Sequence, residues 1–388
     1  MRIAVTGASG FCGGHVARAA AAAGSSVVCL GRRPGPLGEQ RFWDAASAGP
    51  DLSGVDVVVH CAAAVGDPAP GSRAEAVMRA VNVGGTARLL RAAAGRPVVW
   101  VGSASVYDPL RDRSRVTEDH PRGNHLNAYG RTKARGEALA LAAGAVVLRP
   151  RAVYGPGDTQ LLPRLLSRVR AGTLLLPGPD VPLSLTAVEN LADACLAAAA
   201  WAPGAYNIAD AAPYERDAAV TAVLHAHGVP ARIRHLPLPL AAAAARAAEA
   251  AARLTGGEPA LSRYAVDQLA HPVVLDLTKA RSQGWSPDRT LEDHLRSRLS
   301  PCLVREPAAD SRSAAIRRGG QRPAPDTTPL WDDFAPAEPG VLSALLGGRR
   351  RYEQQLALQR ERFAAAEDLH RRAVADHRNQ ADASSRPP

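Results

Sequence analysis

The chain has 388 residues, of which 46% are hydrophobic, so it can bury the core of one large domain or of two smaller ones. Its formal net charge of +10 comes mainly from arginines that are scattered rather than clustered with aromatic residues, which argues against nucleic-acid binding. The five cysteines are widely spaced and form no CxxC pair, which argues against a disulfide framework and a zinc site; we expect no metal.

The N-terminal segment MRIAVTG is typical of a β-strand, so we expect no signal peptide before the fold. The alanine-rich stretch over residues 240–254 is interrupted by Arg246, Glu249 and Arg253. No apolar run therefore reaches the length of a membrane span. These features predict a cytoplasmic protein without membrane insertion.

Short apolar runs alternate with alanine-rich stretches over about the first 200 residues. The apolar runs predict strands over residues 3–5, 26–30, 55–60, 98–101 and 145–148. The stretches between and after them predict helices over 11–23, 73–94, 127–143 and 188–201. Nearly continuous apolar strands between helices are typical of a parallel sheet covered on both faces. We therefore expect an α/β fold with a Rossmann-type, doubly wound parallel sheet.

Beyond residue 156 the pattern is less regular and richer in proline, leucine and alanine. We expect a smaller, mostly helical substrate lid here, with one more strand over 273–275. Gly284 is predicted to end a short helix, and Thr290 with Asp293 to cap another. The predicted domain spans 1–300, with its Rossmann core mainly in 1–155 and 181–210 and its lid mainly in 156–180 and 211–272.

The sequence changes character again after residue 300, where we expect a C-terminal extension. Residues 301–340 are rich in proline, arginine, aspartate and alanine, which is typical of a linker. Residues 341–388 are predicted to contain a helix and a disordered tail, because their apolar stripe is thin.

A glycine-rich segment, TGASGFCG at residues 6–13, follows the first predicted strand and opens the first predicted helix. Gly7 permits a tight turn, Gly10 lets the backbone approach a pyrophosphate, and Gly13 allows close packing of helix on strand. The N-terminus of the helix offers free N–H groups and a positive dipole to the phosphates. This context favours a dinucleotide site over a turn that binds nothing.

Two arginines, Arg32 and Arg33, follow the second predicted strand, where NAD-selective sites usually carry an acidic residue. A carboxylate would repel a 2′-phosphate, whereas a guanidinium can bind it through two hydrogen bonds. The pair therefore favours NADP(H) over NAD(H). The alternative interpretation is that both arginines are ordinary solvated loop residues.

Tyr129 and Lys133 are four residues apart in a predicted helix and so share one face. A neighbouring ammonium is expected to lower the pKa of a phenol from about 10, which makes proton exchange with a carbonyl oxygen feasible. A serine after the preceding strand can donate a hydrogen bond to that oxygen. Ser103 is our choice for this role, with Ser105 in reserve.

The chain resembles the extended short-chain dehydrogenase/reductase family, also described as NAD-dependent epimerases/dehydratases, over about residues 1–300. The motifs that carry the resemblance are, in chain order, TGASGFCG, HCAAAV, NVGGT, GSASVY, YGRTK, LRPRAVYGPGD, SLTAVENLADA and GWSPDRTLEDHLR. The resemblance implies a Rossmann fold, a nicotinamide dinucleotide cofactor and the capacity to form a homodimer. It matches Ser103, Tyr129 and Lys133 to catalytic positions. It matches further residues to cofactor-binding positions, namely Gly7, Gly10, Phe11, Cys12, Gly13, Ala62 and Asn82.

Within this family the chain is most similar to the 3β-hydroxysteroid dehydrogenase group. Sugar-nucleotide epimerases often carry an asparagine after the sixth strand, and the run RPRAV at 149–153 contains none. The leading hypothesis is NADP(H)-dependent hydride transfer to or from a ketone or secondary alcohol of an apolar, steroid-like or polyketide-like small molecule. The alternatives are a sugar-nucleotide epimerase or dehydratase and a non-catalytic cofactor-binding scaffold.

Overall fold

Seven parallel strands form the central sheet of the computed structural model, in the order β11-β6-β5-β4-β1-β2-β3. Most of them are short runs of valine, leucine and isoleucine that are buried on both faces. The strands are β1 (Arg2–Thr6), β2 (Ser26–Gly31), β3 (Glu39–Phe42), β4 (Val57–His60), β5 (Val98–Val101), β6 (Val146–Pro150) and β11 (Gly204–Ile208). The chain order reverses between β1 and β4, as in a doubly wound fold, so the predicted fold class is confirmed.

The structure describes residues 1–255 and 258–299. The predicted linker over 301–340 and the predicted helix and tail over 341–388 lie outside the described residues.

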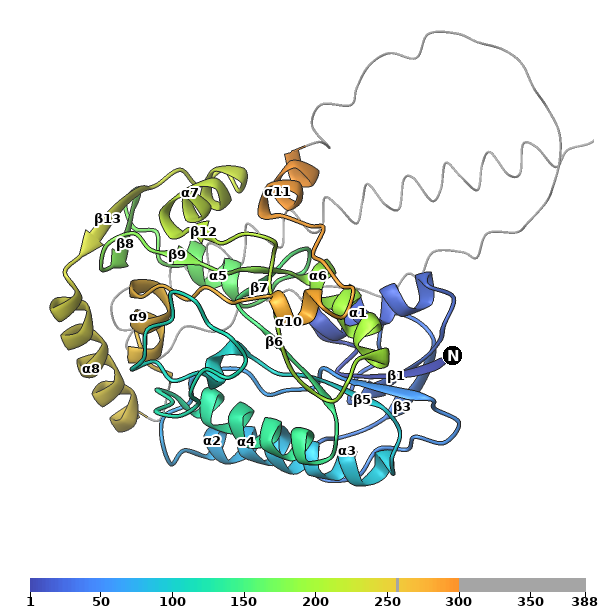
Figure 1. Cartoon of the computed structure of the whole chain (residues 1–388). Coiled ribbons are helices and arrows are strands. Elements are labelled where there is room, and N and C mark those ends of the chain that lie inside the picture. The colour runs from blue at the N-terminus through green and yellow to red at the C-terminus, as the bar shows by residue number, and fades with distance from the viewer. Residues whose placement is uncertain (256–257, 300–388) are drawn as a thin grey trace, which may run out of the picture. The chain divides into compact units, whose positions relative to one another are not determined.

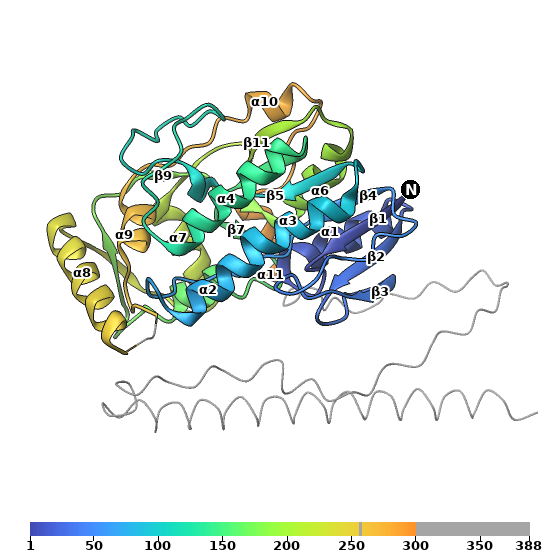
Figure 2. The same cartoon turned by 90° about the horizontal axis from the view of Figure 1, so that it is seen from below.

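Helices cover both faces of the sheet. On one face, α1 (Phe11–Ala22) and α6 (Val188–Ala197) pack together and bury alanine, valine and leucine side chains against the strands. On the other face lie α3 (Thr86–Ala93) and α4 (Ala128–Ala142), which Figure 2 shows in front of the strands together with α2 (Arg73–Arg79). Each face therefore has its own apolar core.

The central sheet and the helices that cover it differ from the predicted elements in two strands and one helix. The sheet gains β3 at one edge and β11 at the other, neither of which was predicted. The predicted helix over 73–94 is divided into α2 and α3 by a π-helical segment at Ala80–Gly85, which contains two glycines. Glycine is unfavourable in a helix interior, which is consistent with a departure from α-helical geometry at this segment. π-Helical turns are also frequent at functional sites.

The second half of the described chain combines helices with small two-stranded sheets (Figure 1). Its helices are α5 (Leu161–Leu166), α7 (Arg216–Ala226), α8 (Leu238–Thr255), α9 (Arg263–Ala270), α10 (Thr278–Arg281) and α11 (Leu291–Leu299). Its strand pairs are β7 (Val153–Tyr154) with β10 (Thr186–Ala187), β8 (Thr173–Pro177) with β13 (Arg232–Leu236), and β9 (Pro182–Leu183) with β12 (Tyr214–Glu215). Within the described ranges, no helix is long and apolar enough to cross a membrane.

The end of the described domain follows the predicted pattern closely. The predicted strand over 273–275 is reduced to two isolated bridges, Val273 with Leu183 and Leu275 with Val116. Gly284 adopts a φ of 81° just after α10, as expected for a residue that ends a helix. The predicted cap of α11 is present, because the Thr290 hydroxyl donates to Asp293 at 2.6 Å and accepts from the Asp293 backbone N–H at 3.2 Å.

Candidate active site

The glycine loop between β1 and α1 leaves no room for side chains. Gly7 has a φ of 67°, in the left-handed region. A Cβ atom on Gly13 would lie 2.3 Å from the Gly7 carbonyl oxygen. Gly10 precedes α1 with no side-chain cap, and the first turn of α1 carries no acidic residue. The free N–H groups of this helix end therefore suit an anion such as a pyrophosphate.

This loop lies at the point where the strand order reverses. The Gly7 N–H donates to the carbonyl oxygen of Leu30 at the end of β2, at 2.8 Å. Ala62, just after β4, donates its N–H to the Thr6 hydroxyl at 3.1 Å. The carboxyl ends of β1, β2 and β4 thus meet around the loop, and this is where doubly wound sheets bind dinucleotides. These residues fit such a cofactor.

Two loop residues matched to the cofactor, Phe11 and Cys12, begin α1 and are partly exposed. Burial raises the pKa of the Cys12 thiol to about 12, with nearby Cys61 adding to the rise. The thiol is therefore neutral at pH 7 and would not repel the phosphates of a bound dinucleotide.

Arg32 and Arg33 directly follow β2 and are exposed. Within the part of the chain that the structure describes, neither guanidinium forms a hydrogen bond or an ion pair with another residue. No carboxylate among the described residues therefore neutralises them. They lie at the carboxyl ends of the strands, as the glycine loop does.

Asn82 lies buried in the π-helical segment between α2 and α3. Its amide oxygen accepts from the Ala64 N–H at 2.7 Å, and its amide nitrogen donates to the Ala64 carbonyl and the Thr132 hydroxyl, both at 3.0 Å. One amide thus joins the loop after β4 to α4.

Helix α4 carries Tyr129 and Lys133 on one face, as the spacing predicted. It begins where the Asn127 side chain accepts from the Gly130 N–H at 2.9 Å. Lys133 is buried, with its Nζ donating to the Val101 carbonyl at 2.6 Å and lying 4.0 Å from the centre of the Trp100 ring. Burial lowers the pKa of Lys133 to about 8, although the neighbouring Cys61, Glu137 and Cys12 raise it.

The pKa of Tyr129 differs from the expectation. Burial raises it above the ordinary value, nearby Tyr264 adds to the rise, and a hydrogen bond with Ser103 lowers it. Lys133 is not among the groups that shift it, and its ammonium donates to the Val101 carbonyl. The phenol therefore stays protonated at neutral pH, which is the form that can donate a proton to a substrate oxygen.

Ser103 follows β5 in a short helical turn, and its hydroxyl oxygen accepts from the Ser105 N–H at 3.2 Å. The Ser105 hydroxyl is itself buried, with no hydrogen-bond partner among the described residues. Both serines line the cavity described below.

A buried ion pair joins α4 to β6. Arg149 donates to Glu137 through Nη2 at 2.7 Å and through Nε at 3.1 Å. The Arg149 guanidinium also donates to the hydroxyl of Tyr107 at 2.8 Å, and both charged side chains are almost inaccessible to water. Glu137 lies one turn beyond Lys133, so this pair holds the face that carries Tyr129 and Lys133 against the sheet.

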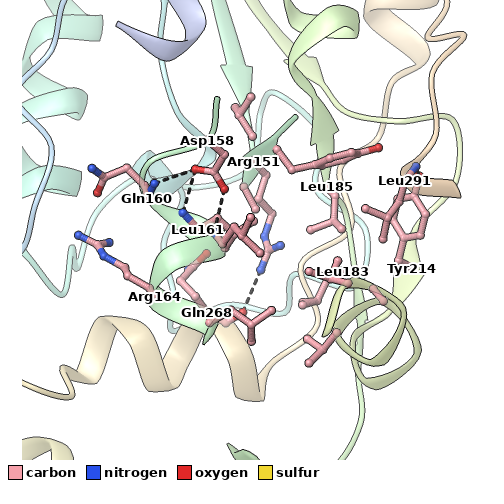
Figure 3. A pocket seen from close by; sticks show the side chains of 18 of the residues that line it. Arg151, Asp158, Gln160, Leu161, Arg164, Leu183, Leu185, Tyr214, Gln268 and Leu291 are labelled. Carbon is pink, nitrogen blue, oxygen red and sulfur yellow. Dashed lines mark hydrogen bonds between the residues drawn. The ribbon is translucent and has the colours of Figure 1, made fainter. Parts of the chain in front are cut away.

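A cavity of about 370 Å³ is lined by Ser103 and by residues from the second half of the described chain. Figure 3 shows part of the lining of this cavity. Its walls come from α5, α7, α11 and the segments around β9 and β10, and most of the lining side chains are apolar. The apolar lining includes Leu161, Leu162, Leu165, Leu183, Leu185, Val220, Val223, Leu291 and Leu295.

Two lining residues, Arg151 and Tyr264, were not identified as site residues from the sequence. Tyr264 lies close enough to Tyr129 and to Arg151 to shift the pKa of both groups. A charged residue directly after an apolar strand was the available signal for Arg151, but the arginine-rich composition obscured it.

A glycine cradle at the switch point of a seven-stranded parallel sheet defines a Rossmann-type, dinucleotide-binding domain. Residues 3–209 match the NAD dependent epimerase/dehydratase family, and the chain belongs to this family. The prediction of an NAD(P)-dependent enzyme of the short-chain dehydrogenase/reductase type is therefore confirmed.

Several characterised relatives are oxidoreductases. The chain is 32% identical to the 4-hydroxy-2-methyl-3-oxo-4-farnesyl-3,4-dihydroquinoline-1-oxide ketoreductase of Stigmatella aurantiaca, over 73% of this chain and 91% of that protein. It is 31% identical to the 2-alkyl-3-oxoalkanoate reductase of Stenotrophomonas maltophilia, over 76% and 98% respectively. It is 30% identical to the human decarboxylating sterol-4-alpha-carboxylate 3-dehydrogenase, over 49% and 55%. The last similarity agrees with the predicted relation to hydroxysteroid dehydrogenases.

Solved structures share the fold. MoeE5, in complex with UDP-glucuronic acid and NAD, superposes with a TM-score of 0.59 at 24% identity, over 78% of this chain and all of that one. The UDP-glucuronic acid 4-epimerase of Bacillus cereus in complex with NAD gives 0.56 at 22%, over 76% and 96%. At these identities the similarity supports the fold alone.

Proposed function

We propose that the protein transfers hydride between NADP(H) and a ketone or secondary alcohol of a largely apolar small molecule. Ser103, Tyr129 and Lys133 form its catalytic group. The dinucleotide, when bound, supplies or accepts the hydride. The protein orients the substrate, moves the proton and excludes water.

The observation that carries this proposal is that Ser103 lines one end of an apolar cavity and is hydrogen-bonded to Tyr129. In the reducing direction, the Ser103 hydroxyl donates a hydrogen bond to the substrate carbonyl oxygen and polarises it. The protonated Tyr129 phenol then passes its proton to the same oxygen. Lys133, an ammonium below about pH 8, supplies positive charge beside the reacting group.

The preference for NADP(H) rests on Arg32 and Arg33. Their guanidinium groups are exposed and without carboxylate partners among the described residues, at the sheet edge where the adenosine ribose of a dinucleotide lies in this fold. A 2′-phosphate at this place would be bound by charge-assisted hydrogen bonds.

The apolar cavity supports the substrate class. Ligand sites of this kind bury most of an apolar ligand and fix its orientation with a few polar groups. The named reductases among the relatives act, as their names state, on a farnesylated quinoline oxide and on 2-alkyl-3-oxoalkanoates. Both are ketones with long apolar substituents, in agreement with this cavity.

The test is a screen of apolar ketones that follows the absorbance of reduced nicotinamide, with NADPH and NADH in parallel. We expect turnover with NADPH, and a loss of about a thousandfold in kcat for Tyr129→Phe, as for removal of a general acid. The matched control is Tyr206→Phe. Its hydroxyl donates to the Ala202 carbonyl away from the cavity, so its kcat should stay within about twofold of wild type.

The same experiment separates the alternatives. A sugar-nucleotide epimerase would retain tightly bound NAD(H) through purification and would convert UDP-sugars without net cofactor consumption. A scaffold would bind the dinucleotide, and Tyr129→Phe would change nothing measurable. Either result would contradict the proposal.

A further inference from the structure

The side chain of Arg151 is a buried cation with unused hydrogen-bond donors. It is 6% exposed and lines the cavity. Nη1 donates to the Ser184 carbonyl at 2.8 Å, and Nη2 donates to the Gln268 carbonyl at 2.9 Å (Figure 3). Nε has no partner among the described residues. Because a guanidinium has five N–H donors, the two bonds to backbone carbonyls leave more than half of its donors unused.

The charge of Arg151 is not neutralised by the carboxylates around it. Asp267 receives two hydrogen bonds from Arg113, at 2.6 and 2.9 Å, so it already forms a complete buried pair. Asp158, which also lines the cavity, accepts three backbone N–H groups at the start of α5 (Figure 3). Burial lowers the pKa of Arg151 to about 10, with Tyr264 opposing this shift, Arg113 adding to it and Asp267 opposing it least. A buried charge without a counter-ion is costly, and a bound anion would relieve that cost.

Arg151 lies beside the proposed reaction centre. Arg151 follows β6, and Ser103 follows β5, the neighbouring parallel strand. Both residues therefore lie at the carboxyl ends of the strands. Tyr264 lies near both Tyr129 and Arg151.

Beyond Arg151 most of the cavity surface is apolar, with leucines on several sides (Figure 3). Of the other two arginines in its lining, Arg164 is exposed and Arg216 is paired with Asp217. A ligand that fits both the Arg151 guanidinium and the apolar wall carries one anionic group close to its reacting carbon and a long apolar remainder.

We propose that Arg151 binds the carboxylate of the substrate, and that the substrate is an apolar hydroxy or oxo acid with its carboxylate near the reacting carbon. This inference rests on the proposed function and specifies its substrate class. Arg151 acts here as a specificity-determining residue, since it contacts the substrate away from the atoms that react.

The kinetic test compares an acid with its neutral ester, because the two differ mainly in charge. The probes are 3-hydroxydodecanoate and methyl 3-hydroxydodecanoate, each oxidised with NADP⁺. We expect wild type to prefer the acid by about tenfold or more in kcat/KM, the value of one buried charge-assisted contact. The acid-to-ester ratio should fall about tenfold in Arg151→Met. The matched control is Arg164→Met, which removes an exposed guanidinium at the same cavity and should leave the ratio within about threefold.

Equal use of acid and ester by wild type would overturn the proposal, as would equal falls of the ratio in Arg151→Met and Arg164→Met. Where Arg151→Met does not fold, Arg151→Gln replaces it, because glutamine can still donate to the backbone carbonyls without the charge. This variant should show the same fall in the ratio.

A binding experiment separates this proposal from the proposed function. Calorimetry in the presence of NADP⁺ compares decanoate with decanamide, neither of which can be oxidised at a hydroxyl. We expect decanoate to bind about tenfold more tightly to wild type, and this difference to disappear in Arg151→Met. If neither alcohol is oxidised but decanoate is still preferred, the proposed function fails and the anion site stands. Equal binding of the two compounds would refute the anion site alone.

Discussion

The cofactor half and the substrate half of the candidate site are built in different ways. Around Gly7 and Gly13 the shape is set by backbone atoms that come too close for any side chain. The cavity beyond Ser103 is instead shaped by side chains from elements far apart in the sequence, such as α5, α7 and α11. Side-chain substitutions therefore cannot be accommodated at Gly7 and Gly13 without a backbone shift, whereas the cavity changes shape with each lining side chain. The two halves of the candidate site thus depend on separate parts of the chain.

Among the tests of this comparison, the largest expected effect concerns the rigid glycine loop. In Gly13→Ala the added Cβ would lie 2.3 Å from the Gly7 carbonyl oxygen, so backbone must shift in the loop. Overpacking of this kind costs about 1–3 kcal/mol, and at the upper end it would raise the Kd for NADPH about a hundredfold. Fluorescence titration with NADPH measures it. Gly49→Ala is the control, since its nearest new contact would be at 3.9 Å. Equal affinities in the two variants would contradict the rigid loop.

The next effect concerns Lys133, at the junction of the two halves. Because burial lowers its pKa to about 8 from 10.5, the ammonium is half deprotonated at about pH 8 and is lost as the pH rises further. We expect kcat/KM to fall about tenfold per pH unit above about pH 8. Lys133→Arg, whatever its residual activity, should lack this alkaline limb because a guanidinium stays charged. A wild-type profile that is flat to pH 10 would refute the role of the charge.

The same pKa shift has a consequence for stability. The folded state disfavours the ammonium of Lys133, so below pH 8 its burial is destabilising. This unfavourable contribution disappears as the pH rises from about 8 to 10.5.

A smaller effect tests the cofactor preference. Replacing Arg32 and Arg33 with alanine should raise the KM for NADPH about tenfold and that for NADH less than twofold, because only the former carries a 2′-phosphate. Steady-state kinetics with both cofactors measure the ratio. The control is Arg91→Ala, an exposed arginine at the end of α3 that lies at the opposite edge of the sheet. Parallel changes for both cofactors would mean that the arginines contribute only general positive charge.

The smallest effect concerns the wall of the cavity. Thr290→Ala removes a reciprocal cap of α11, whose Leu291 and Leu295 line the cavity. We expect a loss of about 1 kcal/mol in the free energy of unfolding, measured by urea denaturation. Thr290→Ser retains the hydroxyl and should restore most of it. No difference between the two variants would show that the cap does not stabilise the helix.

Much of the cofactor half could be predicted from the sequence, because its residues are adjacent in the chain. The glycine spacing and the Tyr129–Lys133 pair each report a local geometry, a turn or a helix face. Strand β3 was missed for an equally local reason. It has the sequence EQRF and lies at the sheet edge with Phe42 largely exposed, so no apolar pattern marks it. The helix predicted over 73–94 is helical throughout residues 73–93, and only its π-helical segment at Ala80–Gly85 was not predicted.

The substrate half could not be predicted, because its residues meet only in the folded chain. Arg151 and Tyr264 come from distant segments, and no spacing joins them to each other or to Ser103. The pKa of Tyr129 was misjudged for the same reason. It is raised mainly by burial and by Tyr264, which no local sequence pattern reports.

The buried pair between Glu137 and Arg149 has a consequence for regiochemistry. It locks the helix that carries Tyr129 to the strand that leads into Arg151, two residues beyond Arg149. The span between the proton donor and the buried cation is thereby fixed by the protein. Such a site would favour substrates with one particular number of bonds between the oxygen-bearing carbon and the acid group. It would therefore discriminate among positional isomers that have the same length and polarity.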